Sequence, residues 1–457
     1  MAAAVHSVFR TAWDRWSKGS LVVRSVRAAG HGRRPLAGSA VGPAVVRAAP
    51  YTLLMAVFFG LVLAVAVPAL RVSILALCVL AAGCWFWPLH AGLVLPFVLM
   101  LGIKMPFFTV GDELLFVRPE HALLTGAGLS LLRGPLARND HPLLTAWAAM
   151  LAAFSVASLA GQIRGTAGNP VFALLPLAQF TAWAFVLVCA RASALRFGEA
   201  GLWAWFVPAA TVAAFGIVEW FRPFEDVAGY RTFERGFFEG QANHMGGLFA
   251  MAVALCAAFL ACPKWRAPAL LTGGMCMAAL LTTGSKEALA AAGVGLCAVV
   301  WLRFTRLRLP VVLAVALLGA WLLSWPPSRL TQAGSSLADR FEAWRNVSVG
   351  IMEHPLFGIG FGARHRSYYD SLCVMVLAET GIIGLGAFLY WLVAHIGALA
   401  HEGSPRKGNV FALGAFGAWT ALACQSLASV GFLVTVMGGP AAWLCGYAIG
   451  LGERERV

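Results

Sequence analysis

The chain has 457 residues, of which 60% are hydrophobic and 12% charged, and its mean hydropathy is +0.78. Water-soluble domains carry about twice that share of charged residues, so the composition excludes a soluble globular protein. Polar backbone groups in a bilayer must pair within the protein, and the long, non-alternating apolar runs of this chain favour helices over strands. We therefore predict an all-α, polytopic helical membrane protein.

The net charge of +14 reflects Lys and Arg residues that lie between the apolar runs. This positive-inside pattern indicates anionic membrane lipids as partners and argues against nucleic acid. Residues 1–49 form a basic tail, which we interpret as a cytoplasmic segment that touches anionic headgroups and not as an organellar transit peptide. Residues 50–457 are predicted to form one helical membrane domain.

The ten cysteines show no CxxC or other metal-ligand spacing. Most of them lie inside apolar runs, where cysteine packs as a small apolar residue. The sequence also contains no P-loop and no zinc-site motif, which argues against ATP hydrolysis and metal-dependent hydrolysis. We therefore predict neither a metal nor a cofactor.

Apolar segments long enough to form membrane helices recur along the chain. They fall at 51–70, 71–89, 91–109, 142–161, 172–190, 200–220, 244–262, 267–283, 286–302, 309–326, 372–397, 409–429 and 432–450. A weaker segment at 114–132 carries Arg118, Glu120 and His121 and fits either a crossing or a short re-entrant helix. The pattern predicts about 13 or 14 transmembrane helices.

The distribution of cationic residues predicts the orientation of these helices. If the N-terminus is inside and the weak segment crosses, the inside connections hold many more cations than the outside ones, as membrane insertion favours. The inside set is Arg133, Arg138, Arg191, Arg196, Lys264, Arg266, Arg303, Arg306, Arg308, Arg406, Lys407, Arg454 and Arg456. The outside set is Arg71, Arg118, Arg164 and Lys286. The N-terminus is thus predicted to be cytoplasmic.

Two longer connections then face away from the cytoplasm, at 221–243 and 327–371. The second is the largest predicted extracytoplasmic loop, and its apolar spacing predicts a helix from about Leu337 to Glu353. The sequence HPLFGIGFG follows, in which glycines alternate with apolar residues and suit tight turns or a close approach to a ligand.

Ionisable and polar side chains gather in these loops and at the adjoining helix ends. Because burying such groups in a membrane costs free energy, we treat them as functional candidates. The set comprises Glu239, Asn243, His244, Lys286, Glu287, Arg340, Arg345, Arg364, His365, Arg366, Asp370 and Glu379. Arginine and lysine suit a diphosphate, which makes Lys286, Arg340, Arg364 and Arg366 candidate ligands. His365 and Asp370 are candidates for a general base. Structural alternatives are an interfacial lysine, a solvated rim of arginines, an Asp370 helix cap and a partnered Glu379 carboxylate.

The segment Asp339–Leu385 resembles the signature region of the O-antigen ligase/polymerase family. The matching residues are Arg340, Trp344, Pro355, Gly358, Gly360, Glu379, Gly381 and Gly384. LLTTGSKEAL is similar to the Thr-Gly-Ser-Arg segment of that family, with Lys286 in the place of the arginine. QANHMGGLFAMA is similar to its Asn-bearing helix start, with Asn243 in that position.

One position departs from the ligases of that family, which usually carry His-Asn at the start of the helix after the loop. This chain has Asp370 and Ser371 there, a pair that looks more like the polymerase branch. The acceptor-activating role is then left to Asp370 or to His365. The resemblance therefore favours a polymerase and keeps an O-antigen ligase as the alternative.

The resemblance implies a GT-C-like, metal-independent, inverting membrane glycosyltransferase of the bacterial inner membrane. Its donor would be an undecaprenyl-pyrophosphate-linked glycan, and its acceptor a second lipid-linked repeat unit or a lipid A-core. Arg340, Arg364 and Lys286 would stabilise the leaving diphosphate, with Arg340 counted as catalytic, and Asn243 and Glu239 would contact the substrate. A flippase and a chain-length regulator are expected partners. A transporter and a structural subunit of the cell envelope are the alternatives from other classes.

Overall fold

The computed structural model describes residues 88–101, 105–110, 113–117, 142–166, 170–221, 242–310, 313, 342–345, 347–348, 351–363 and 371–456. All of them lie in one compact unit, Leu53–Val457. The predicted boundary between a tail ending at residue 49 and a membrane domain starting at residue 50 lies outside the described residues and stays a prediction. So do the predicted span at 51–70, most of the span at 71–89 and most of the span at 309–326.

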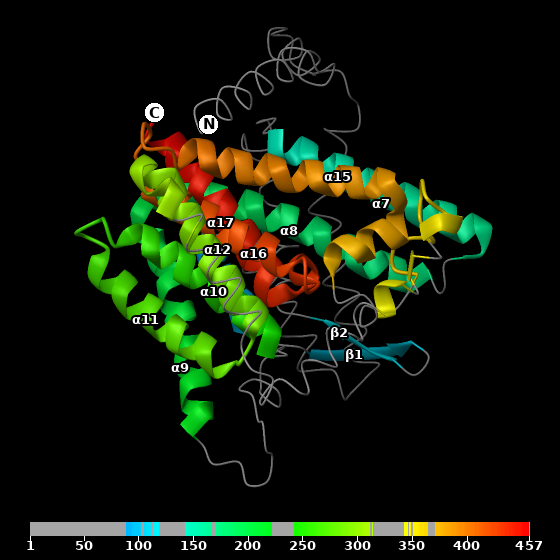
Figure 1. The fold of residues 1–457 in the computed structure, drawn as a ribbon, viewed down its shortest axis with the longest axis horizontal. Helices are drawn as coiled ribbons and strands as arrows, with labels where there is room; N and C mark the ends of the chain where they lie inside the picture. The colour runs from blue at the N-terminus through cyan, green and yellow to red at the C-terminus, as the bar shows by residue number, and fades with distance from the viewer. Residues whose placement is uncertain are drawn as a thin grey trace, which may run out of the picture. The chain divides into compact units, whose positions relative to one another are not determined.

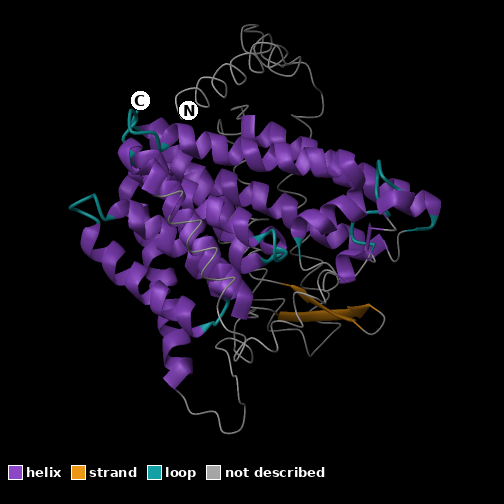
Figure 2. Cartoon of the chain, in the orientation of Figure 1, coloured by secondary structure: helices purple, strands orange, loops and turns teal. Residues whose placement is uncertain are grey.

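Helices dominate the described part of the chain (Figure 1; Figure 2). Their bounds are α5 Pro88–Leu101, α7 Pro142–Arg164, α8 Pro170–Phe197, α9 Trp203–Phe221, α10 Ala242–Phe259, α11 Arg266–Thr282, α12 Lys286–Arg303, α15 Leu372–Glu402, α16 Val410–Gln425 and α17 Thr435–Arg454. Short 3-10 turns follow α8, α12 and α16, at Gly198–Leu202, Thr305–Leu307 and Gly431–Leu433. The prediction of a polytopic helical membrane protein is thus confirmed, and each described helix from α7 to α17 overlaps a predicted apolar segment.

Four helical stretches among the described residues are long and apolar enough to cross a bilayer. They are Pro142–Arg164, Pro176–Phe221, which covers most of α8 and all of α9, Ala242–Phe259 and Leu372–Glu402. α11 and α16 are apolar but shorter. The predicted total of about 13 or 14 spans stays a prediction, because part of the chain lies outside the described residues.

A short β-hairpin interrupts the helical pattern before α7. Strand β1, Met105–Val110, pairs antiparallel with β2, Glu113–Val117. The helix predicted to extend to residue 109, and the helical reading of residues 114–117, were therefore wrong. Proline at 106 lacks the N–H that a helix needs. The aromatic and β-branched residues around a Gly-Asp pair are a hairpin signal that was overlooked.

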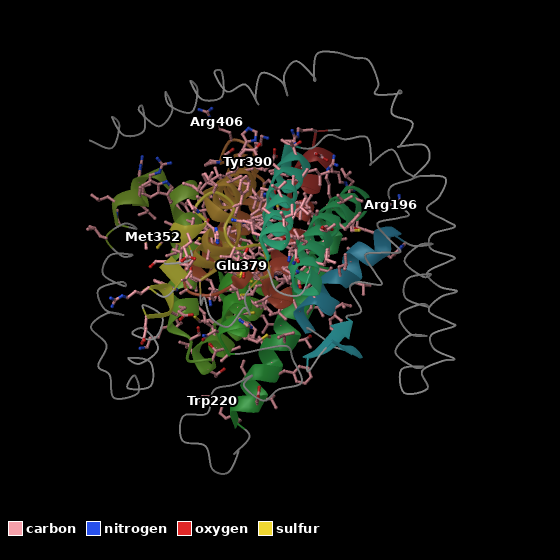
Figure 3. All side chains as sticks on the ribbon, turned by 90° about the vertical axis from the view of Figure 1, so that its right-hand side faces the viewer. Arg196, Trp220, Met352, Glu379, Tyr390 and Arg406 are labelled. Carbon is pink, nitrogen blue, oxygen red and sulfur yellow. The ribbon has the colours of Figure 1, made fainter. Side chains whose placement is uncertain are left out.

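One end of the helical bundle collects the cations that the sequence placed inside. Arg191 pairs with Glu453 at 2.8 Å, and Lys264 with Glu199 at 2.5 Å. Glu402 accepts from Lys407 at 2.6 Å and from Arg456 at 3.2 Å. We call this the basic end, and it joins the C-terminal ends of α8, α15 and α17. Figure 3 shows the labelled Arg406 and Trp220 at opposite ends of the described helices, with Glu379 between them.

Both α5 and α7 start near the basic end. In α5, the carbonyl of Gly92 accepts from Trp443 of α17 at 2.6 Å, and Leu99 packs over Gly439, which lies further from the basic end. In α7, Trp147 packs against Trp391 of α15, and Arg164 reaches the opposite end. Both helices therefore run from the basic end toward the opposite end. Residues 114–117 of the weak segment belong to β2 and residues 118–132 lie outside the described residues, so a crossing there stays a prediction.

α10 lies at the centre of the bundle, since fifteen of its residues, on every face, are buried. It packs against α11, α12 and α16. α7, α9 and α11 instead expose large apolar side chains such as Ile163, Phe221 and Leu271, as expected of helices that face lipid. The central position of α10 brings its N-terminus, with Asn243, close to the other helix ends described next.

Candidate functional site

The turn Thr283–Lys286 connects α11 and α12 at the end of the bundle opposite the basic end. Gly284 has φ +60°, a conformation that favours glycine. The Ser285 hydroxyl accepts from the amide of Ala288 at 3.3 Å and so caps α12. The Thr283 hydroxyl donates to the Leu280 carbonyl at 2.7 Å and accepts from the Ser285 amide at 3.3 Å. Each residue of Thr-Gly-Ser thus shapes the turn that places the half-buried Lys286 at the first position of α12.

The start of α10 packs directly against this turn. A Cβ at Gly246 would lie 2.7 Å from Cβ of Ala288 and 3.2 Å from Cβ of Ser285, so only glycine permits the approach. The two sequence segments that carry Asn243 and Lys286 are therefore neighbours in space. The fold brings together these two candidates, which are separated by the whole of α11.

The C-terminal end of α16 links α10 to α15. The Gln425 amide donates to the backbone carbonyl of Asn243 at 3.2 Å. The amide of Leu372 approaches the carbonyls of Ser426 and Ser429, each at 3.0 Å. The N-termini of α10, α12 and α15 consequently gather at one end of the bundle.

Ser371 caps α15, because its hydroxyl accepts from the amide of Val374 at 3.5 Å and its own φ and ψ are extended. The alternative interpretation of Asp370 as the cap was therefore wrong. The cap is the second residue of the Asp-Ser pair that stands where ligases usually carry His-Asn.

α15 is broken at Gly381, which has φ +65°. The loop Pro355–Gly362, called the glycine loop below, supplies the hydrogen bonds that the break removes. The amides of Ile359 and Gly360 donate to the carbonyls of Ala378 and Glu379, at 3.0 and 2.9 Å. In the reverse direction, the amides of Ile382 and Ile383 donate to the carbonyls of Pro355 and Leu356, at 2.9 and 3.4 Å. Four backbone bonds thus join the loop to the broken helix, and the polar groups on both sides of the break are satisfied.

Glycine is required on both sides of this junction. A Cβ at Gly381 would overlap the carbonyl group of Leu356, and one at Gly358, where φ is +62°, would overlap the backbone of Glu379. Gly360 and Gly362 also have positive φ, at 112° and 79°. The motifs Pro-x-x-Gly-x-Gly and Glu-x-Gly-x-x-Gly are therefore two halves of one structural unit.

The carboxylate of Glu379 is buried and accepts from the amide of Gly362 at 2.7 Å. This bond confirms that the carboxylate has a partner, as burial in an apolar helix requires. It holds the end of the glycine loop against α15, immediately before the predicted polar residues at 364–370 begin. Glu379 is also one of the family-like positions, and its contact gives that position a physical role.

The other side of the glycine loop rests on the end of α7. Arg164 donates to the Gly358 carbonyl at 2.7 Å and bonds Nδ1 of His354 at 3.1 Å. Thr166 donates to the Ile359 carbonyl at 2.7 Å. The sequence places Arg164 only among the predicted outside cations, and His354 directly after a predicted helix. No sequence signal could have joined them, because they lie 190 residues apart.

The candidates at Glu239, Arg340, Arg364, His365, Arg366 and Asp370 lie outside the described residues, and their roles stay predictions. The helix predicted from Leu337 to Glu353 is helical at residues 342–345, 347–348 and 351–353, and Val347 is buried as its apolar spacing predicts. Within the part of the chain that the structure describes, no three His, Cys, Asp or Glu side chains are grouped to hold a metal ion.

Comparison with known proteins identifies the segment that contains most of this geometry. Residues 274–389 match a family model described as O-antigen ligase. This segment is similar to an O-antigen ligase domain. The domain starts in α11 and includes the Thr283–Lys286 turn, the glycine loop and the break in α15, while Asn243 and Arg164 precede it. A search among curated proteins finds no match.

The match confirms the family resemblance that the glycine motifs indicated. O-antigen ligase domains belong to glycosyl-transferring enzymes of polysaccharide and lipopolysaccharide biosynthesis, which supports an enzyme in the membrane. The match gives no support to the transporter alternative.

Proposed function

We propose that the protein is a membrane glycosyltransferase that joins polyprenyl-pyrophosphate-linked glycan repeat units into a longer chain. The observation that carries the proposal is the meeting of the N-terminus of α10 with those of α12 and α15, both of which lie within the segment similar to an O-antigen ligase domain. Helix N-termini present N–H donors and a partial positive charge, and Lys286 adds a full charge there. This combination suits a diphosphate that must be held while its bond to the sugar breaks.

The proposed reaction is a single displacement at the anomeric carbon of the donor. The acceptor hydroxyl oxygen forms a bond to that carbon while the bond from the carbon to the diphosphate oxygen breaks, which inverts the configuration. Lys286 would stabilise the leaving charge together with Arg340, Arg364 and Arg366, as preorganised cations do in a site that excludes water. Asp370 or His365 would take the proton of the acceptor hydroxyl.

A polymerase is favoured over a ligase because Asp370 and Ser371 precede α15. In the ligase alternative the same site would transfer the glycan to a lipid A-core acceptor. Both versions place the site at the face of the inner membrane away from the cytoplasm, with the basic end inside. A flippase would deliver the lipid-linked repeat unit to that face, and a chain-length regulator would limit the product.

The test is a deletion strain whose glycans are separated by gel electrophoresis. Loss of long chains with single repeats retained on the lipid core supports a polymerase, and loss of all transfer to the core supports a ligase. Complementation with the full chain should restore the wild-type ladder. An unchanged ladder in the deletion strain would refute the proposed function.

A further inference from the structure

The glycine loop lies between two supports, and the second support belongs to a helix outside the O-antigen ligase domain. α15 binds the loop amides of Ile359 and Gly360, as described above. α7 binds the carbonyls on the other side, because Arg164 donates to Gly358 and Thr166 to Ile359, both at 2.7 Å. α15 thus binds the amides of this turn-rich segment and α7 binds its carbonyls.

The backbone of α7 is shaped for the same contact. A Cβ at Gly161 would lie 2.6 Å from Cα of Gly360 and from the carbonyl oxygen of Ile359, so only glycine lets α7 pass this close. The buried Ser158 hydroxyl approaches the carbonyl of Phe361 at 3.4 Å, and the Phe361 ring packs on Phe154 with centroids 4.4 Å apart. Contacts with the glycine loop therefore recur over three turns of α7. We call this surface of α7 the seat of the loop.

All three nitrogens of the Arg164 side chain are engaged by the protein itself. Nε donates to the Ala160 carbonyl at 3.0 Å, Nη1 bonds Nδ1 of His354 at 3.1 Å, and Nη2 donates to Gly358. A guanidinium only donates, so Nδ1 of His354 is the acceptor nitrogen. The guanidinium of Arg164 therefore bonds its own helix, the loop and the residue that precedes the loop.

We propose that Arg164 is a positioning residue for glycosyl transfer, which it serves by seating the glycine loop; this rests on the proposed function. The predicted cations and Asp370 belong to segment 364–370, and the described residues on both sides of this segment are hydrogen-bonded. Before it, Gly362 is bonded to Glu379, and after it, Leu372 is bonded to the end of α16. Arg164 bonds His354, directly before the loop, and Gly358 in its middle, and so helps to set the position of Gly362 at its end.

The prediction concerns the rate of the chemical step more than donor binding. Displacement of catalytic groups by about 1 Å can lower a rate on the order of 100-fold. We expect Arg164→Ala to lower kcat by about 10- to 100-fold while KM for the lipid-linked donor changes by about twofold or less. Arg164→Lys, which keeps the charge but loses the fork that spans His354 and Gly358, should fall between.

The experiment uses the full-length protein in detergent with lipid-linked glycan extracted from the deletion strain. Steady-state kinetics give kcat and KM, and hydrogen exchange followed by mass spectrometry reports the amides of residues 355–363. In Arg164→Ala these amides should exchange faster than in wild type. Thr166→Val, which removes only the bond to the Ile359 carbonyl, should change both readouts in the same direction by less.

Matched controls separate seating from general damage. Arg308 also donates from Nε to a backbone carbonyl, that of Trp301 at 3.2 Å, and Thr181 donates to the Leu177 carbonyl of its own helix. Arg308→Ala and Thr181→Val should leave kcat and the exchange of residues 355–363 as in wild type. If either control reproduces the loss seen in its counterpart, the effect is not specific to the seat and the proposal is overturned.

Hydrogen exchange and kcat test different parts of the proposal, and each can contradict its part independently. Exchange at residues 355–363 that is unchanged in Arg164→Ala and Arg164→Lys overturns the seating, whatever the activity. Faster exchange with a wild-type kcat overturns the contribution of seating to catalysis. If the wild-type chain itself transfers no glycan, the proposed function fails and the role in turnover fails with it, while the exchange data still decide whether Arg164 holds the loop.

Discussion

The amide of Gly360 donates to the carbonyl of Glu379 at 2.9 Å, where an unbroken helix would place the amide of Ile383. A short loop thus replaces a missing turn of hydrogen bonds inside a membrane helix. In lipid such a break is tolerated only where protein satisfies the exposed backbone groups. The pairing explains why two glycine motifs separated in sequence occur together.

The break in α15 gives the first prediction. Gly381→Ala puts a Cβ where φ is +65° and where the carbonyl of Leu356 already lies, so it should destabilise the protein by about 1–3 kcal/mol or more and abolish glycan products. Gly386, also in α15, has nothing within 4 Å of the corresponding position. Gly386→Ala should therefore keep both Tm and activity. Thermal unfolding in detergent compares the two, and equal Tm values would contradict the assignment.

A second prediction concerns the buried carboxylate of Glu379, which accepts from the amide of Gly362. Glu379→Gln keeps an acceptor oxygen of similar reach and should retain most of the stability. Glu379→Leu leaves the amide without this acceptor and should cost about 1–3 kcal/mol. Hydrogen exchange at residues 360–363 should rise only in the leucine variant. Equal exchange in both variants would show that the carboxylate does not hold the loop.

Features that depend on neighbouring residues in the sequence could be predicted, whereas contacts between residues far apart in the sequence could not. The helix expected at 286–302 is observed at Lys286–Arg303, because a continuous apolar run bounded by charges is a local signal. The approach of Asn243 to the Thr283–Lys286 turn was not predicted; family resemblance only gave each of these residues a role toward the substrate. The break at Gly381 and the Arg164 contact were missed, since each depends on a partner about 25 to 190 residues away whose position only the fold determines.

A third prediction tests Lys286 as a diphosphate ligand. Lys286→Ala should lower kcat/KM for the lipid-linked donor by about 100-fold, as loss of one preorganised donor does in other enzymes. Lys286→Arg restores the residue usual in the family and should retain activity. The control is Lys264→Ala, which removes an exposed lysine paired with Glu199 at the basic end. Full activity in Lys286→Ala would remove this residue from the proposed site.

The last prediction tests the orientation, which follows from the collection of cations at the basic end. Arg406 is exposed beside this end, and Trp220, near the end of α9, is 49% exposed at the opposite one (Figure 3). If the basic end is cytoplasmic, as the positive-inside pattern requires, a membrane-impermeant maleimide should label Trp220→Cys in intact spheroplasts. Arg406→Cys should be labelled only after the membrane is permeabilised. Labelling above the wild-type background in the reverse order would invert the topology and move the proposed diphosphate site to the cytoplasmic face, where an extracytoplasmic transferase could not work.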